Sequence, residues 1–452
     1  MVLDPLSIKQ ETQLAINIAM SGRKGPVWLD IPLDIQCAII DESKLLPVLP
    51  EETILECNRE DIEGVFNLLR HSEKPCILAG NAITVLHKEK FLKMLSLLEI
   101  PVIGASCNPD IMYWEHPLYF GSSGILGTRS GNIILQSSDV ILALGCGFRY
   151  KQTGFSLENF APRAKIIMID IDENESKKPG LRIYKFLHAD IKSFFDITIK
   201  TNTKIKALDT WINHCNYLKR YFDPFENATG KNEEPVNAYN FWKYYSKYEP
   251  EDNITVLGNN SGTGARIQNG ITKKKQRTLN NINYGAMGYD IPAAIGISIA
   301  SKKAVVLVTG DGSFMMNMQE LQTIIHNKLA VKIVIFSNGG YAGIQETCKN
   351  YFYGKMFGCT KESGISFPNL KKLAIAFGFE YKTCATNGNI GLSLKWLFSK
   401  TNYCILEIKQ KTDNPSLPKV VSRINDGISS PAALHDMYPF LNKEEIERLM
   451  KY

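Results

Sequence analysis

Two polar sequences each follow a strand-like run of apolar residues, and their side chains could together hold a metal ion. The first run ends at Gly-Asp-Gly-Ser (310–313), and the second ends at Ser-Asn-Gly-Gly-Tyr (337–341). The residues between the two runs predict about four turns of helix. In a parallel strand–helix–strand unit, both strands have their carboxyl ends at one edge of the sheet. We therefore expect Asp311 and Asn338 to meet at that edge.

This pattern suits a divalent cation bound to a phosphate. Mg²⁺ prefers six oxygen ligands, and proteins commonly supply only a few of them. The Asp311 carboxylate, the Asn338 amide oxygen and the Gly340 carbonyl would supply three. A helix beginning near Ser313 would direct free backbone N–H groups toward an anion at the same edge. Because a lone Asp-Gly is commonly only a tight turn, the prediction of a metal–diphosphate site depends on the whole string.

The string resembles the signature of thiamine-diphosphate enzymes, in which Gly-Asp-Gly is followed by Asn-Asn. This chain has Ser337-Asn338, and only the second asparagine is the usual ligand. The segment Met-Asn-Met-Gln-Glu-Leu-Gln-Thr (316–323) is similar to the acetolactate synthase branch. The resemblance implies thiamine diphosphate and Mg²⁺ as cofactors, with Asp311, Asn338 and Gly340 holding the metal. The residues that it implies for cofactor binding are Gly285, Ala286, Met287, Gly310, Asp311, Gly312, Ser313, Asn338, Gly340 and Tyr341.

A segment upstream (283–296) resembles the part of the family that binds the aminopyrimidine ring. The resemblance implies that the Gly285 carbonyl accepts a hydrogen bond from the 4′-amino group. It also implies that Met287 lies under the cofactor and keeps it bent, which lets the cofactor remove its own proton. Methionine is also an ordinary core residue, so a purely structural role for Met287 remains the alternative.

The alternation of strand and helix patterns predicts an α/β fold with two doubly wound parallel-sheet domains and a remnant of a third. Strands are expected near 76–80, 101–105, 140–145, 166–171, 254–258, 304–309, 331–336 and 403–408. A helix over 7–22 and a buried strand over 25–32 are expected before them, and a short helix over 442–451 after them. The expected parts are a remnant (1–37), a linker (38–52), a central domain (53–200), a connector (201–234), a diphosphate-binding domain (235–412) and a tail (413–452).

The middle of the chain, including Lys-Pro-Cys-Ile-Leu-Ala-Gly (74–80), resembles the central domain of acetolactate synthase-type enzymes. In several relatives this domain carries FAD that does no redox work, so FAD is a possible ligand here. Acetolactate synthases commonly have an arginine in place of Gly147. The sequence Gly-Cys-Gly (145–147) lacks the third glycine of a dinucleotide fingerprint. Asp170 and Asp172 could bind a ribose, or they could cap the turn that follows them.

The opening residues, including 22–36, resemble the end of the family's pyrimidine-binding domain. In the family, the beginning of that domain holds the glutamate that activates the cofactor. No residue matches the motif of this glutamate, and neither Glu11 nor Glu320 is assigned its role. We therefore identify no catalytic residue. We expect the chain to be incomplete without an N-terminal domain, which is either a separate chain or lost.

The resemblance implies an acetolactate synthase-like carboligase or decarboxylase that acts on a 2-oxo acid such as pyruvate. The cofactor adds to the carbonyl, CO₂ leaves, and the two-carbon unit attacks a second carbonyl. The tail sequences 426–431 and 436–441 look more like relatives that pass a two-carbon unit to a keto-sugar in surface polysaccharide biosynthesis. A third hypothesis is a catalytically silent fragment or the cofactor-binding subunit of a split enzyme.

The amino-acid composition limits the partners and the cellular compartment that we expect. The chain has 452 residues, 44% of them hydrophobic, and a net charge of +6 without an aromatic–basic pattern, so no nucleic-acid partner is expected. No apolar stretch is long enough to predict a membrane span. Its ten cysteines form no Cys-x-x-Cys pair, which favours a reduced, cytoplasmic protein. The resemblance implies a homo-oligomer, a dimer or a tetramer, or a partnership with a separate N-terminal domain.

Overall fold

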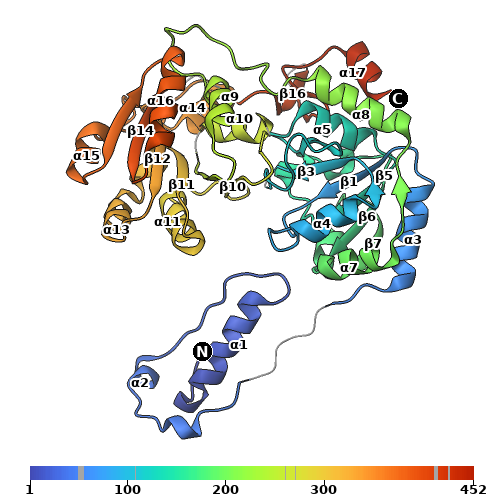
Figure 1. Ribbon diagram of the computed structural model, residues 1–452, viewed down its shortest axis with the longest axis horizontal. Coiled ribbons are helices and arrows are strands. Elements are labelled where there is room, and N and C mark those ends of the chain that lie inside the picture. The colour runs from blue at the N-terminus through green and yellow to red at the C-terminus, as the bar shows by residue number, and fades with distance from the viewer. Residues whose placement is uncertain are drawn as a thin grey trace.

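The computed structural model contains two α/β units and an N-terminal segment that extends away from them (Figure 1). It describes residues 1–48, 55–106, 108–259, 261–269, 271–411, 416–425 and 428–451. Parts of the expected linker and tail therefore lie outside the described residues, at 49–52, 413–415, 426–427 and 452.

The first unit is built on a six-stranded parallel sheet. Its spatial order is β4 (Tyr119–Ser123), β3 (Val102–Ala105), β1 (Pro75–Ala79), β5 (Val140–Leu144), β6 (Lys165–Asp170) and β7 (Ile183–His188). Nearly every residue of the inner strands is buried and apolar, as expected for a parallel sheet that is covered on both faces.

Helices cover both faces of this sheet. Ile77 of β1 packs in one core with α3 (Arg59–Arg70), α4 (Lys88–Leu95) and α7 (Ile191–Thr201). The neighbouring Leu78 points to the other face, because side chains alternate along a strand, and packs with α5 (Arg129–Ser137) and α8 (Asp209–Tyr221). The residues expected as a connector (201–234) thus contribute a helix to this core. The remaining elements are β2 (Leu98–Glu99), β8 (Ile205–Lys206), α6 (Tyr150–Thr153), η3 (Leu157–Asn159) and η4 (Glu173–Lys177).

The second unit repeats this architecture. Its parallel sheet has the order β10 (Arg277–Asn280), β9 (Ile254–Leu257), β11 (Val305–Gly310), β12 (Val331–Ser337), β14 (Cys404–Lys409) and β13 (Glu380–Cys384). One face packs on α9 (Ala238–Tyr248), α10 (Ser261–Asn269) and α16 (Ile390–Ser399). The other face packs on α11 (Asp290–Ser301), α13 (Leu321–His326) and α15 (Leu370–Ala376). This unit also contains α12 (Asp311–Met315), η5 (Met318–Glu320), α14 (Ala342–Tyr351) and η6 (Asn387–Asn389).

The two doubly wound domains and all eight strands expected for them are confirmed, with shifts of one or two residues at the ends. The single helix of four turns expected after Gly310 is wrong. The chain instead forms α12, η5 and α13, and it breaks at Asn317. Asn317 leaves helical geometry, and its side chain bonds to the Gly288 carbonyl at 2.7 Å. A tertiary hydrogen bond thus overrides local helix propensity.

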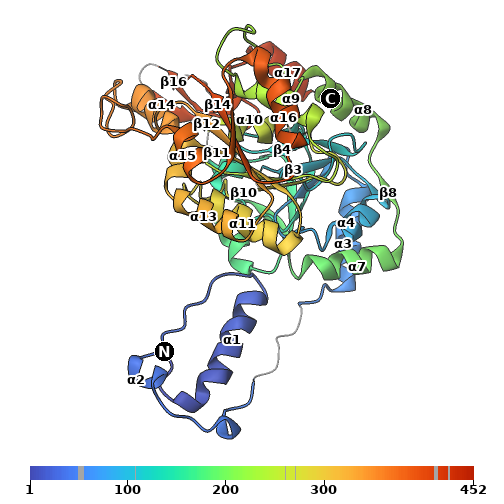
Figure 2. The same ribbon diagram turned by 60° about the vertical axis from the view of Figure 1, so that its left-hand side comes forward.

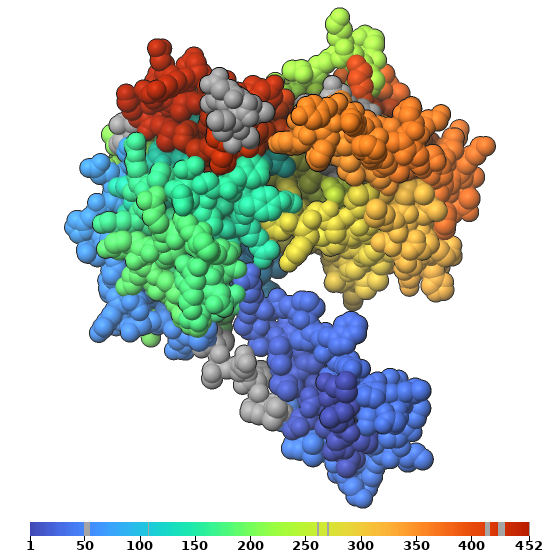
Figure 3. Space-filling view, turned by 180° about the vertical axis from the view of Figure 1, so that it is seen from behind, coloured from blue at the N-terminus to red at the C-terminus, as the bar shows by residue number. Residues whose placement is uncertain are grey.

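The N-terminal segment contains η1 (Pro5–Ser7), α1 (Ile8–Met20), α2 (Leu33–Gln36) and η2 (Glu42–Lys44). The helix expected over 7–22 is confirmed as α1, but none of its residues is buried. The buried strand expected over 25–32 is wrong. These residues form no strand, and Trp28 is 92% exposed. Pro26 removes a backbone donor, and no strand among the described residues pairs with this segment. Figure 3 shows this segment projecting from the rest of the molecule.

The end of the tail packs on the first unit (Figure 1), while residues 417–419 at its start bond to Tyr239, Gln268 and Glu346 of the second unit. Met437 and Leu449 are buried in the core beside α5 and α8. The buried Arg129 guanidinium donates to the Met437 carbonyl at 3.1 Å and to the Pro439 carbonyl at 2.5 Å. The tail contains β15 (Lys419–Val420), β16 (Ser422–Asn425), β17 (Ile428–Pro431), β18 (Met437–Tyr438) and α17 (Lys443–Met450), which confirms the expected last helix. Among the described residues, no helix is long and apolar enough to cross a membrane.

Candidate functional site

The carboxyl ends of β11 and β12 bring Asp311 and Asn338 together, as the sequence predicted. The two strands are paired in parallel up to Gly310 and Phe336, so the next residues leave the sheet side by side. The Asp311 carboxylate accepts hydrogen bonds from the backbone N–H of Asn338 at 3.0 Å and of Gly339 at 2.8 Å. One side chain therefore joins the ends of both strands.

Asp311 is almost fully buried, and this determines its electrostatics. Burial raises the pKa of its carboxyl group, while the backbone N–H groups of Gly339, Asn338 and Gly312 act in the opposite direction. The carboxylate is thus only partly compensated by neutral donors. A cation placed against it would favour the charged form.

The loop after β12 supplies further oxygens. The Asn338 amide oxygen accepts from the Gly340 N–H at 3.1 Å, so the side chain lies over its own loop. Together with the Asp311 carboxylate and the Gly340 carbonyl, this amide gives the oxygen-rich set that Mg²⁺ takes. No group of three or more His, Cys, Asp or Glu that could hold a metal occurs in the described part of the chain. A metal here would depend on one carboxylate with amide and backbone oxygens.

The loop at 285–288 is fixed to α12. The Gly288 N–H donates to the Ser313 hydroxyl at 2.9 Å, and Asn317 donates to the Gly288 carbonyl at 2.7 Å. A Cβ atom on Gly312 would lie 2.3 Å from Tyr341 Cε1 and 3.3 Å from Met287 Cε. The structure therefore brings together all three groups of predicted site residues, at 285–287, 310–313 and 338–341.

Asn259 is a site residue that the sequence reading missed. Its side-chain amide donates to the Gly285 carbonyl at 2.6 Å. That carbonyl is the group that the family resemblance assigns to the aminopyrimidine, and a carbonyl oxygen can accept two hydrogen bonds. Asn259 follows β9, which lies beside β11, so its position after a predicted strand was a signal that could have identified it.

A cavity of about 200 Å³ adjoins Gly285 and Ala286 and is lined by both units. From the first unit comes Lys151, whose ammonium group donates to the Ile282 carbonyl. Burial lowers the pKa of Lys151. Its position could accommodate the carboxylate of a small acid. No local sequence signal marks Lys151, because its relation to this site arises only from the contact between the two units.

Comparison with known proteins agrees with this geometry. Residues 62–196 match the central domain of thiamine pyrophosphate enzymes, and residues 256–408 match their C-terminal TPP binding domain. The probable acetolactate synthase large subunit of Methanocaldococcus jannaschii is 31% identical over 436 residues, which cover 89% of this chain and 70% of the relative. The chain belongs to the thiamine pyrophosphate enzymes of the acetolactate synthase type.

Two further relatives are also named as acetolactate synthase large subunits, and their sequence identity to this chain is similar. The probable large subunit of Methanococcus aeolicus is 30% identical over 84% of this chain and 66% of its own length. The isozyme 1 large subunit of Escherichia coli is 27% identical over 90% of this chain and 71% of its own length. The chain thus spans about two thirds of the length of these acetolactate synthase relatives.

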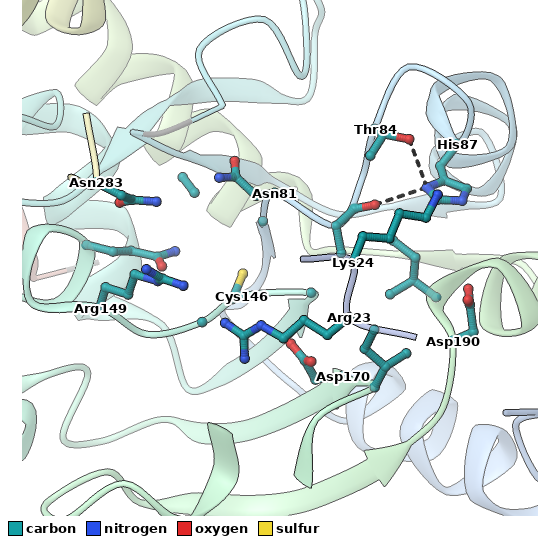
Figure 4. Close-up of a pocket in the computed structure, with 18 of the residues that line it drawn as sticks. Arg23, Lys24, Asn81, Thr84, His87, Cys146, Arg149, Asp170, Asp190 and Asn283 are labelled. Carbon is teal, nitrogen blue, oxygen red and sulfur yellow. Dashed lines mark hydrogen bonds between the residues drawn. The ribbon is translucent and has the colours of Figure 1, made fainter. Parts of the chain in front are cut away.

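This acetolactate synthase-type chain has a second, larger cavity, which is lined mainly by its first unit, with Asn283 from the second unit. The cavity has a volume of about 440 Å³ and lies at the carboxyl ends of the strands (Figure 4), where open α/β sheets bind ligands. Arg23, Lys24 and Arg149 bring positive charge to it, and Asp170 also lines it. The buried Gln152 also lines it, and the Nε2 atom of this side chain has no hydrogen-bond partner.

Asp170 and Asp172 differ in their roles. Asp172 caps η4 by accepting from the Asn174 N–H at 3.0 Å and pairs with Arg23 at 2.6 Å, which agrees with the capping interpretation. Asp170 accepts from the Asp172 N–H at 3.1 Å and lines the cavity, and burial raises the pKa of its carboxyl group. Asp170 therefore lines the cavity, whereas Asp172 pairs with Arg23.

We predict that Gly312→Ala destabilises the enzyme. The added methyl would overlap the Tyr341 ring, and forcing an extra carbon into a packed site costs about 1–3 kcal/mol. The matched control is Gly296→Ala in α11, where a Cβ would meet nothing within 4 Å. That change should stabilise the helix by about 0.5–1 kcal/mol. Denaturant unfolding measures both, and equal stability of the two variants would contradict the packing described here.

Proposed function

We propose that this chain binds Mg²⁺ and thiamine diphosphate and takes part in decarboxylation and carboligation of a 2-oxo acid such as pyruvate. The observation that carries the proposal is the junction at Asp311, where one buried carboxylate joins the two strand ends that bear the other oxygen ligands. In this proposal Asp311, Asn338 and Gly340 hold the metal. The diphosphate lies against it, next to residues 310–313.

Thiamine diphosphate, when bound, supplies a thiazolium carbon that adds to a carbonyl and accepts the electron pair released with CO₂. The protein's part is placement and electrostatics. The Gly285 carbonyl would orient the aminopyrimidine, with Asn259 fixing that carbonyl. Met287, next to Gly312 and Tyr341, would hold the cofactor bent. Lys151 would hold the carboxylate of the acid by a charge-assisted hydrogen bond.

The proposal predicts that Asp311→Ala abolishes Mg²⁺-dependent binding of thiamine diphosphate. Loss of a residue that merely supports a metal ligand costs about 10- to 100-fold in affinity, so loss of the anionic ligand itself should cost more. Isothermal titration with and without Mg²⁺ measures the effect, and circular dichroism checks the fold. The control is Asp252→Ala, an exposed carboxylate paired with Lys303 at the surface. Unchanged affinity in Asp311→Ala would refute the metal assignment.

We further propose that a pyrimidine-binding domain from another chain completes the active centre. The residues that line the cavity beside Gly285 and Ala286 include no Asp or Glu, so the described residues offer no acid there to activate the cofactor. Exposed apolar side chains on the N-terminal segment, including Trp28 and Leu33, would find a partner in such a domain. The working assembly in this proposal is cytoplasmic, and is either a homo-oligomer or a complex with that domain.

This second proposal predicts negligible pyruvate consumption by the purified chain with saturating Mg²⁺ and thiamine diphosphate. Adding a pyrimidine-binding domain that carries the activating glutamate should raise the rate by about 10²- to 10⁴-fold, the usual contribution of a placed proton donor. The same domain with its glutamate changed to glutamine is the control. Robust turnover by the chain alone would mean that one of its own residues replaces the glutamate.

FAD is the ligand that we propose for the larger cavity. The support is the buried Gln152 amide, because a donor without a partner costs stability unless a ligand accepts from it. Arg23, Lys24 and Arg149 offer charge for phosphates, and Asp170 offers an acceptor for a ribose hydroxyl. These groups fit a dinucleotide in chemical type. In such a complex they would hold the ligand in place.

We predict that the chain retains flavin absorbance after incubation with FAD and gel filtration, and that Gln152→Leu retains several-fold less. In the absence of ligand, Gln152→Leu should unfold at a higher temperature than the parent. The change removes a buried donor whose lack of a partner costs about 1–3 kcal/mol of stability. Gln319→Leu, an exposed change in η5, is the control. No flavin retained by the parent would exclude FAD from this cavity.

A further inference from the structure

Three sulfur atoms lie together behind the loop that follows β12. They belong to Cys348 on α14 and to Met356 and Cys359 in the segment after it. The Cys359 Sγ is 3.9 Å from the Met356 Sδ. Burial and the neighbouring Cys348 thiol raise the pKa of the Cys359 thiol. Both cysteines are almost fully buried. The site proposed above uses none of these sulfurs.

The contact between the two cysteines follows from the way α14 packs. Gln345 and Cys348 are three residues apart and share one face of the helix. The Gln345 side-chain amide donates to the Cys359 carbonyl at 2.8 Å. That hydrogen bond fixes the Cys359 turn against the helix face that carries Cys348. This hydrogen bond places the backbone of Cys359 beside α14, on the helix face that carries Cys348.

The same turn supports the loop at 338–341. The Cys359 carbonyl also accepts from the Tyr341 N–H at 3.0 Å, and a Cβ on Gly340 would lie 2.5 Å from it. The Ser363 hydroxyl closes the turn by accepting from the Cys359 N–H at 3.0 Å. A covalent change at Cys359 would thus act on the backbone next to Gly340 and Tyr341.

The segment that covers the two thiols has no regular secondary structure. Residues 352–369 form no helix or strand, and their exposed side chains include Phe352, Tyr353 and Phe357, of which Tyr353 is 98% exposed. Figure 2 shows α14 and the loop after it at the outer edge of the second unit. A segment with few buried contacts opens locally at small cost. Small reagents would reach the thiols through such opening.

We propose that Cys348 and Cys359 form a redox-modification site in which a small-molecule disulfide, such as oxidised glutathione, converts the two thiols to a disulfide. One cysteine attacks a glutathione sulfur and releases the first glutathione thiol. The other cysteine attacks the resulting mixed disulfide at the protein sulfur and releases the second. Two electrons and two protons thus pass to the glutathione disulfide. The new bond ties the Cys359 turn to α14 and holds the carbonyl that supports Tyr341.

The test uses the full-length chain with Cys37→Ser, because Cys37 is an exposed thiol that would react independently. After treatment with oxidised glutathione, intact mass should fall by two hydrogen atoms. Chymotrypsin, which cleaves after aromatic residues such as the exposed Tyr353 and Phe357, should give peptides of Cys348 and Cys359 that stay joined until a reductant is added. Two free thiols, or stable glutathione adducts on both cysteines, would overturn the proposal.

Single variants sharpen the result. Cys348→Ser and Cys359→Ser should each trap one glutathione on the remaining cysteine, because the second step has no attacking thiol. Cys384→Ser, which changes a buried cysteine at the end of β13, should form the disulfide like the parent. If a site variant fails to fold, the parent's intact mass and peptide pair still decide the question. Absence of trapped adducts in folded variants would overturn the exchange mechanism.

The effect of the disulfide on the loop at 338–341 is measured by hydrogen exchange in the absence of cofactor. Hydrogen exchange at the Tyr341 amide should slow at least several-fold in the oxidised chain, because the bond suppresses the local opening that exposes it. Unchanged exchange in a fully oxidised sample would overturn the link between this site and the loop. Neither measurement involves thiamine diphosphate or Mg²⁺, so failure of the proposed function and failure of this inference are distinguishable.

Discussion

The hydrogen bonds from two consecutive backbone N–H groups to the Asp311 carboxylate are the constraint on which the site depends. They join the ends of β11 and β12 after the sheet's own hydrogen bonds have stopped. They fix the start of the loop at 338–341 relative to α12. The carboxylate also remains buried and only partly compensated, which leaves it suited to a cation. One side chain therefore provides both the geometry and the charge of the site.

From this junction the constraint spreads to the loop at 285–288. Ser313 is two residues after Asp311, and its hydroxyl holds the Gly288 N–H. Asn317 holds the Gly288 carbonyl, and the helix breaks at Asn317. The helix is thus broken because Asn317 bonds to the Gly288 carbonyl. A continuous helix would keep Asn317 in regular helical geometry and complete the backbone hydrogen bonds of the helix, but it would lose the bond from Asn317 to the loop at 285–288.

The sequence predicted well where one strong local pattern determined the result. Buried parallel strands read as unbroken apolar runs, and glycine-bounded polar residues after them gave Asp311, Asn338 and the sheet edge where they meet. It failed where the outcome depended on distant partners. The strand expected over 25–32 has the right composition, yet it has no neighbour to pair with. Asn317 looked helical because its partner, Gly288, is remote in sequence. The functional roles of the predicted residues remain predictions.

Contacts between the two units explain why Lys151 escaped prediction. The Asp110 carboxylate of the first unit accepts from the Arg277 side chain at 2.6 Å and from the Thr278 N–H at 2.9 Å, both on β10 of the second. This fixes β10, and with it residue Ile282 shortly after, relative to the first unit. Lys151 can then reach the Ile282 carbonyl beside Gly285. The cavity next to the site is therefore a product of docking between units, and neither unit's sequence pattern contains it. Substitutions that weaken the Asp110–Arg277 pair would act on the cavity without touching any residue that lines the metal site.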